Sequence, residues 1–347
     1  MLLGYSPLYP TDAIERALPD REAALTLLRE RRPDLVDSLA EVASRHGADP
    51  RALDAAWLGT ARLGLRHGSF GPDVHAYHNE THVLEVGHRR LLRLVEGLGE
   101  AAPAAMDVDL LLVFAACHDL RQRETVDVPG PVGGNEAASC AEALRILEAC
   151  GYRREADRSQ FVGLELMIAG STFDARPVAD APEPDDVAAD ELTALVGGSL
   201  ARGLALWLDS ALPSWRQDED ARRGERLSRL AADLDTANVG EPFPLLCGTA
   251  VRLCREREMR SGRSLESAAS AQPCLDFLGP GQERYFNELH RFSSREGQQV
   301  FGAGKRENAA RVREATAALL AHFSAAPPAT GQAVVDAFKA LTRADEG

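Results

Sequence analysis

The sequence predicts an all-α protein, and three observations carry that prediction. Aromatic residues make up only 5% of the 347 residues, and alanine, leucine, arginine and glutamate dominate the composition. Runs of alternating β-branched residues, which are typical of strands, are missing. Apolar residues recur at helical spacing along most of the chain. We therefore expect a helical bundle.

The first half of the chain contains three clear helical patterns. Residues 20–43 carry an apolar stripe that Pro33 interrupts. A long helix is expected over 78–98. Asp107 is a candidate N-cap for the next helix, whose residues 108–117 are apolar all round. A helix without a polar face belongs at the centre of a bundle.

Helical patterns continue to the end of the chain. Asn135 and Gly151 are a candidate cap and stop for a helix over 135–150. Further helices are expected over 191–212, 219–234 and 243–260, and from 283 to the C-terminus. Two stretches rich in proline with glycine or aspartate, 124–134 and 172–191, are expected to be loops, the second a surface loop outside any metal site. The expected division is a helical extension over 1–60, a catalytic domain over 61–325 and a helical tail over 326–347.

Composition excludes several classes of partner. The net charge is −14, from 39 basic and 53 acidic residues, and we find no dense basic stripe, so we expect no binding to extended nucleic acid. No apolar run approaches the ~20 residues of a membrane helix. The N-terminus lacks the pattern of a secretory signal. The six cysteines show no framework spacing, which predicts buried or half-buried thiols in a reducing cytoplasm.

Three segments carry residues that could bind a divalent cation. Tyr77-His78-Asn79-Glu80-Thr81-His82 opens a predicted helix, on which two histidines four residues apart share one face. His118-Asp119 ends the apolar helix, where an ionised carboxylate is costly without a cation or strong hydrogen bonds. Residues 231–235 supply two more carboxylates, Asp233 and Asp235. Two imidazoles with two carboxylates form a typical ligand set for a divalent metal.

The order and separation of these motifs resemble the HD superfamily of metal-dependent phosphohydrolases. The likeness rests on Tyr-His-Asn-x-x-His (77–82), His-Asp (118–119), Asn-Glu-x-x-Ser (135–139) and Ala-Asp-Leu (232–234), and covers roughly 75 to 310. It is closest to class I cyclic-nucleotide phosphodiesterases and to bacterial predicted HD phosphohydrolases. It implies an HD-type, phosphodiesterase-like helical bundle that binds one or two divalent ions, of Mn, Fe, Zn, Ni or Mg.

The resemblance also implies roles for single residues. His82, His118, Asp119 and Asp233 would hold the first metal ion, with Asp119 bridging to a second, while Asp235 stays open as an alternative last ligand. His78 would give a proton to the leaving oxygen, and Glu136 would orient water at the metal. Weaker candidates for contact with substrate are three residues with side chains suited to a nucleotide: Tyr77, Asn79 and Gln272.

The sequence also departs from the phosphodiesterase pattern. Gln122 stands where those enzymes have a further histidine, and no histidine lies between 118 and 290, which argues against oxygenase chemistry. Arg121 and Arg123 could meet a substrate phosphate or solvate a helix end, and solvation is favoured. The expected substrate is a phosphodiester such as a cyclic nucleotide. A nucleotide phosphomonoesterase with the same site, or a silent HD module that binds nucleotide or metal, remains an alternative.

Overall fold

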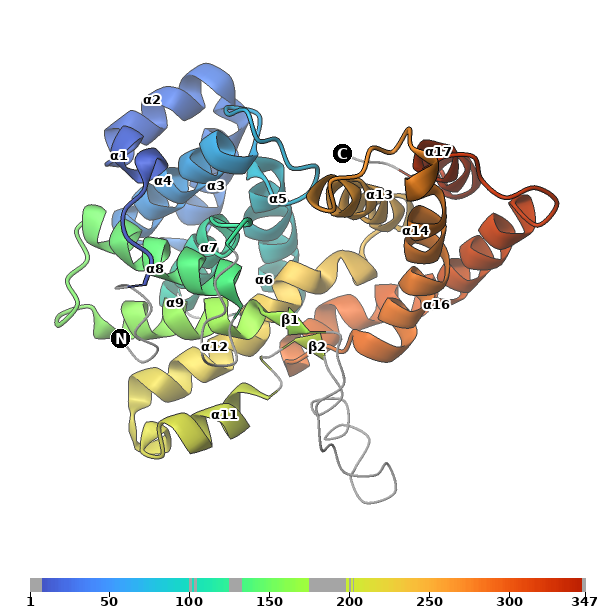
Figure 1. Cartoon of the computed structure of the whole chain (residues 1–347). Helices are drawn as coiled ribbons and strands as arrows, with labels where there is room; N and C mark the ends of the chain where they lie inside the picture. The colour runs from blue at the N-terminus through green and yellow to red at the C-terminus, as the bar shows by residue number, and fades with distance from the viewer. Residues whose placement is uncertain are drawn as a thin grey trace. The chain divides into compact units, whose positions relative to one another are not determined.

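The computed structural model describes residues 8–99, 102, 105–124, 133–174, 198–199, 201 and 203–344. The fold is all-α, as predicted (Figure 1). Two compact units divide the described chain. The first spans residues 1–235 with 292–300, and the second spans residues 236–291 with 301–347.

The first unit contains most of the helices. In chain order they are α1 (Ala13–Ala17), α2 (Arg21–Arg31), α3 (Pro33–His46), α4 (Pro50–His67), α5 (Glu80–Leu84), a π-helical turn (Glu85–Arg90), α6 (Leu91–Leu98), α7 (Ala105–Cys117), α8 (Gly134–Ala149), α9 (Arg158–Ser171), α11 (Leu204–Ala211) and α12 (Glu219–Thr236). Two strands of two residues each, β1 (Phe173–Asp174) and β2 (Gly198–Ser199), pair antiparallel after α9.

Packing of α4 against α7 forms the centre of this unit (Figure 1). Every residue from Leu110 to Cys117 is buried, which confirms the prediction of a central helix without a polar face. At Gly59 a β-carbon would lie 2.8 Å from Cys117 Sγ and 2.9 Å from the Ala116 carbonyl oxygen. The two helices therefore approach as closely as a glycine allows. This contact fixes the end of α7, where His118 and Asp119 follow.

A network of charged side chains packs against the turn that follows the C-terminal end of α7. Glu142 on α8 is fully buried and pairs with Arg62, Arg66 and Arg121, at 3.4, 3.0 and 2.9 Å. Arg121 is thus buried in an ion-pair network and does not solvate a helix end, contrary to the prediction. The network joins α4 and α8 to the turn after α7.

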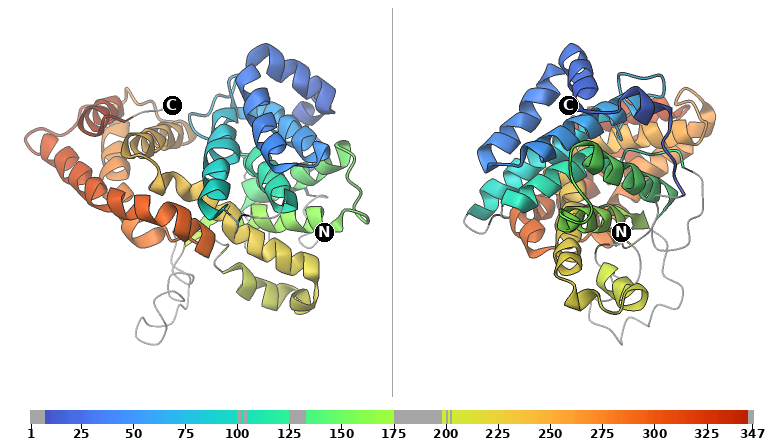
Figure 2. Two further views of the ribbon diagram at one scale, coloured as in Figure 1. Left: turned by 180° about the vertical axis from the view of Figure 1, so that it is seen from behind. Right: turned by 90° about the vertical axis from the view of Figure 1, so that its left-hand side faces the viewer.

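The second unit is a smaller helical bundle. It holds α13 (Phe243–Arg260), α14 (Ala271–Asp276), α15 (Gln282–Arg284), residues 301–322 of α16 (Arg295–His322), and α17 (Gly331–Thr342), as Figure 2 shows from behind. Helix α17 packs against α13 and α14. The amide of Asn308 donates to the carbonyls of Val239 and Glu241, at 2.9 and 2.8 Å, and so ties α16 to the turn that precedes α13.

The predicted domain boundaries at residues 60 and 325 differ from this division. Residue 60 lies inside α4, whose contacts with α2, α3 and α7 place the first helices in the same unit as His118 and Asp119. Residues 326–347 are not a separate tail, because α17 belongs to the second bundle. The first 60 residues therefore form part of the body that carries the candidate site.

Several helix boundaries also differ from the sequence prediction. Asn79 is the N-cap of α5, so His78 precedes the helix. Helix α7 begins at Ala105, and Asp107 lies in its first turn, where it pairs with Arg223 at 2.8 Å instead of capping. Asn135 lies inside α8 and accepts a hydrogen bond from the Glu124 amide. Part of the expected helix 191–212 is strand β2.

Other boundaries are confirmed. Pro33 separates α2 from α3 and occupies the first turn of α3. Gly151 follows the C-cap of α8 with a φ of +86°, a conformation that suits glycine. Helix α13 spans the predicted 243–260. The expected loops at 124–134 and 172–191 lie largely outside the described residues.

The buried network around Glu142 predicts a large effect of one substitution. Glu142→Ala leaves two buried arginines, Arg62 and Arg121, and the half-buried Arg66 without their shared carboxylate, so the free energy of unfolding should fall by about 3–5 kcal/mol in urea denaturation. Glu148→Ala is the control on the same helix. Its side chain is 41% exposed and pairs with Arg154, so the change should stay within about 0.5 kcal/mol. Equal effects of the two variants would contradict a supporting role for the network.

Candidate metal centre

Three separate elements of the first unit bring four candidate ligands together. The sequence predicts three of them, and the fourth, Asp235, is the alternative that the sequence leaves open. His82 lies in α5, which starts where the Asn79 side chain accepts a hydrogen bond from the Thr81 amide at 2.8 Å. His118 and Asp119 directly follow α7. Asp235 lies in the last turn of α12. The side chains converge although more than 150 residues separate the first from the last.

The distances among the donor atoms suit a single ion. His82 Nε2 lies 3.1 Å from Asp235 Oδ1 and 3.6 Å from Asp119 Oδ2. His118 Nε2 lies 3.5 Å from Asp235 Oδ1 and 3.0 Å from Asp119 Oδ2. Adjacent ligand atoms held about 2.1 Å from one ion in tetrahedral or octahedral geometry are about 3.0–3.4 Å apart. Each imidazole nitrogen is therefore near ligand spacing from each aspartate. The donor atoms of His82, His118 and Asp235 all lie within 4.8 Å of one another, and Asp119 adjoins both imidazoles.

Hydrogen bonds on the far side of each ring direct the metal-binding nitrogen inward. His118 Nδ1 lies 3.1 Å from the Phe114 carbonyl oxygen, which can only accept, so Nδ1 carries the proton. His82 Nδ1 lies 3.3 Å from the Glu85 carboxylate. When the rings are neutral, Nε2 is then the lone-pair nitrogen in each, and it faces the two aspartates. Outer partners of this kind are usual for histidines that bind metals.

Burial and charge also fit a cation. His82 is fully buried, whereas the side chains of Asp119 and Asp235 are 13% and 22% exposed to solvent. Solvent therefore reaches the cluster from the side of the two carboxylates. His118 Nε2 is buried and makes no well-aligned hydrogen bond among the described residues. A buried nitrogen without a hydrogen bond is costly, and coordination would remove that cost.

Electrostatics within the cluster favour the charged forms of His118, Asp119 and Asp235. Burial would lower the pKa of His118, but Asp119 and Asp235 raise it well above its usual value. Burial would raise the pKa of Asp119 and Asp235, but the facing histidines lower both. Two ionised carboxylates therefore face His118, whose raised pKa favours a proton that compensates part of their charge. A divalent cation can replace that proton.

Asp233 is not part of this cluster, which corrects the predicted ligand set. Its carboxylate accepts hydrogen bonds from the Ser293 amide at 2.6 Å, and from the Ser294 amide and hydroxyl at 2.8 and 2.6 Å. Residues two apart on a helix point roughly 200° from each other, so only one of the two aspartates can face His82. Asp233 instead holds the segment that begins α16. The alternative left open in the sequence, Asp235, takes the position of the last ligand.

His78 and Glu136 lie beside the cluster. His78 precedes the helix, so it does not share a helical face with His82 as predicted, yet the two ring centres are 6.2 Å apart. Tyr77 packs between them, with ring centres 4.9 Å from His78 and 4.4 Å from His82. Burial raises the pKa of Glu136, and the nearby Asp119 raises it further, while His78 and His118 oppose this. Both candidate catalytic groups thus interact with the centre without being among its four donors.

The two remaining candidates for substrate contact have other partners. The Asn79 amide caps α5 with its oxygen and donates from its nitrogen to the His75 carbonyl at 2.7 Å. Gln272 is exposed on α14 of the second unit and donates to Asp276 at 2.7 Å. Neither amide is directed into the cluster by these bonds.

Sequence reasoning missed the supporting residues of the centre. Gln122, noted only as a departure from the phosphodiesterase pattern, donates to Asp119 Oδ1 at 2.8 Å and so fixes that carboxylate. Glu85 was not singled out, although its position three residues after His82 places it on the same helical face. This spacing was the feature of the sequence that could have identified Glu85 as a partner of His82.

A second group of possible ligands, His67, Asp73 and His75, lies nearby in the sequence. Arg123 donates to both oxygens of Asp73, each at 2.7 Å. His67 Nε2 accepts a hydrogen bond from the backbone amide of Gln122 at 3.3 Å, and His67 Nδ1 lies 3.3 Å from an Asp73 carboxylate oxygen. These donors are engaged with one another, so the group is a hydrogen-bonded support for the turn after α7. Arg123 therefore pairs with Asp73 while its side chain stays 47% exposed to solvent.

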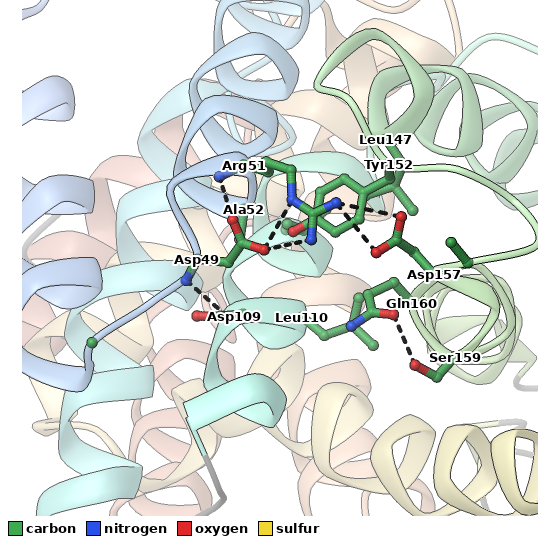
Figure 3. A pocket seen from close by; sticks show the side chains of 13 residues that line it. Asp49, Arg51, Ala52, Asp109, Leu110, Leu147, Tyr152, Asp157, Ser159 and Gln160 are labelled. Carbon is green, nitrogen blue, oxygen red and sulfur yellow. Dashed lines mark hydrogen bonds and ion pairs between the residues drawn. The ribbon is translucent and has the colours of Figure 1, made fainter.

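A cavity of ≈ 500 Å³ in the same unit contains none of the candidate site residues (Figure 3). Arg51 lies between Asp49 and Asp157, at 2.7 and 3.2 Å, and stacks over the ring of Tyr152 at 4.1 Å. Among the described residues that line it there is no histidine and no cysteine. These lining residues therefore offer no thiol and no metal-binding imidazole.

Comparison of the chain with protein-family models, with curated proteins and with solved structures finds no match. Among the described residues, no helix combines the length and the apolar character needed to cross a membrane. Functional inference for this chain therefore rests on its motifs and on the geometry of the cluster.

Replacing each of the two aspartates of α12 with alanine should have opposite effects on metal affinity and on stability. Asp235→Ala should lose metal affinity, because a donor is removed, with a smaller loss of stability. Asp233→Ala should keep the metal but lower the free energy of unfolding by about 2 kcal/mol, because three hydrogen bonds to the start of α16 are lost. Chelator competition and urea denaturation measure the two effects. Loss of metal from a folded Asp233→Ala variant would restore the sequence-based assignment.

Proposed function

We propose that this chain is a cytoplasmic metal-dependent phosphohydrolase of the HD type that hydrolyses a small phosphodiester, such as a cyclic nucleotide. The observation that carries the proposal is the convergence of His82, His118 and Asp235 at ligand spacing, with Asp119 beside both imidazoles. It supports the resemblance that the motif order suggests. Two imidazoles and two carboxylates suit Mn, Fe, Zn, Ni or Mg, alone or with a second ion that shares Asp119.

A divalent ion held by these four residues would neutralise phosphoryl oxygens and lower the pKa of water. The residues of the chain supply the rest of the chemistry. His78, whose charge acts on Asp119, would give a proton to the departing alkoxide oxygen. Glu136, which interacts electrostatically with Asp119, would accept a hydrogen bond from the attacking water and so orient it. Tyr77 holds the His78 ring by edge contact.

The arginines after the HD motif favour a diester over a monoester. A phosphomonoester carries a charge of about −1.5 to −2 at neutral pH, and its recognition commonly uses arginine. Arg121 is engaged by Glu142 and Glu124, and Arg123 by Asp73. A diester, with one negative charge, needs less positive charge beyond the metal.

The direct test is metal-dependent turnover of a substrate panel. The protein is stripped with a chelator, reloaded with each candidate metal, and assayed on bis(p-nitrophenyl) phosphate, cyclic mononucleotides, and nucleoside mono- and triphosphates. We expect diester hydrolysis that requires metal and is lost in His82→Ala. Faster turnover of monoesters would favour the phosphomonoesterase alternative. A loaded protein that turns over no ester would contradict catalysis and favour a silent binding module.

His78 can be separated from the metal ligands by the choice of leaving group. His78→Ala should keep its metal and lose roughly 10²–10⁴-fold in rate on a cyclic nucleotide, whose leaving alkoxide needs a proton. The loss should be much smaller on the nitrophenyl diester, because nitrophenolate departs without one. His88→Ala is the matched control, since His88 pairs with Glu41 at 2.8 Å. Equal losses on both substrates, or loss of metal, would show that His78 is not the proton donor.

A further inference from the structure

Arg90 is the largest side chain that is fully buried in the described structure, with 1% of its surface exposed. Taking a guanidinium out of water is costly unless its charge is paired and its hydrogen bonds are satisfied. Arg90 belongs to the π-helical turn Glu85–Arg90 that directly follows α5 and its ligand His82. What this buried charge contacts therefore matters for the site.

One end of Arg90 reaches the partner of a metal ligand. Arg90 Nη2 lies 3.6 Å from Glu85 Oε2, and the same oxygen lies 3.3 Å from His82 Nδ1. On an α-helix, residues five apart point roughly 140° from each other. The π-helical turn, with its hydrogen bonds from residue i to i+5, brings positions 85 and 90 to one face. This local distortion is what allows Arg90 to meet Glu85.

The other end of Arg90 reaches the backbone beneath a second ligand. Arg90 Nη1 donates to the carbonyl oxygens of Leu234 and Asp235, at 3.2 and 2.5 Å. These carbonyls belong to the last turn of α12, where helix carbonyls lack partners within the helix and attract positive charge. The guanidinium thus fixes the position of the turn from which the Asp235 side chain extends.

We infer that Arg90 is a positioning residue for the proposed metal centre. Through Glu85 it sets the orientation of the His82 ring, and through the end of α12 it sets the position of Asp235. Two ligands that are 153 residues apart are thereby held with Nε2 and Oδ1 at 3.1 Å. The inference rests on the proposed metal centre, and it does not depend on which phosphate ester is hydrolysed.

The test compares Arg90 with another buried arginine that has similar partners. Arg62 donates to a backbone carbonyl, Leu18, and pairs with two carboxylates, those of Glu15 and Glu142. Arg90→Lys and Arg62→Lys both keep the charge but cannot span two sets of partners. Glu85→Gln, which leaves Arg90 in place, is the second variant if Arg90→Lys folds poorly. Each full-length protein is stripped of metal and titrated with Co(II) alone, with a competing chelator, while the visible spectrum and urea stability are recorded.

Arg90→Lys and Glu85→Gln should each weaken Co(II) affinity tenfold or more and change the visible spectrum, which reports ligand geometry. Because they act through one linkage, the double variant should lose little more than either single variant. Arg62→Lys should lose stability while keeping the Co(II) affinity and spectrum. Wild-type affinity and spectrum in both Arg90→Lys and Glu85→Gln, or an equal loss of affinity in Arg62→Lys, would overturn the inference. Absence of ester turnover with these shifts intact would overturn only the proposed function.

Discussion

Close packing between α4 and α7 is the constraint on which the candidate site depends. A helix that is apolar on every side can only lie inside the bundle, and Gly59 lets α4 approach Cys117 and Ala116 without an intervening side chain. His118 and Asp119 are the first polar residues after that helix. Their place at the edge of the core therefore follows from the burial of the eight residues before them.

A polar pair at the end of such a helix is useful only if it is held in one orientation. The turn after α7 is fixed by three neighbouring side chains: Gln122 bonds Asp119, Arg121 enters the network around Glu142, and Arg123 clamps Asp73. These contacts do not touch the donor atoms that face His82. These polar contacts thus hold the turn rigid, while only a few inward-facing atoms remain to bind a ligand.

The fold class and the first three candidate ligands could be predicted because they depend on local patterns. The apolar run before His118, the break at Pro33 and the limits of α13 follow from side-chain period and backbone restriction over a few residues. His82, His118 and Asp119 belong to short motifs in which neighbours in the sequence are neighbours in space. The caps were less predictable: Asp107 and Asn135 are suited to cap a helix, but tertiary partners, Arg223 and the Glu124 amide, engage them inside the first turn.

The chain by itself thus determined an all-α fold, a buried central helix and a set of histidines and aspartates capable of binding a divalent ion. Only the tertiary structure decided which carboxylate of α12 completes that set. Asp233 and Asp235 have the same chemistry and differ by two positions, so their sequence context does not separate them. Which one faces His82 depends on the rotation of α12 about its axis, and long-range contacts set that rotation: Ser293 and Ser294 bind one aspartate, and Arg90 binds the backbone of the other. Such contacts join residues far apart in the chain, where no local pattern records them.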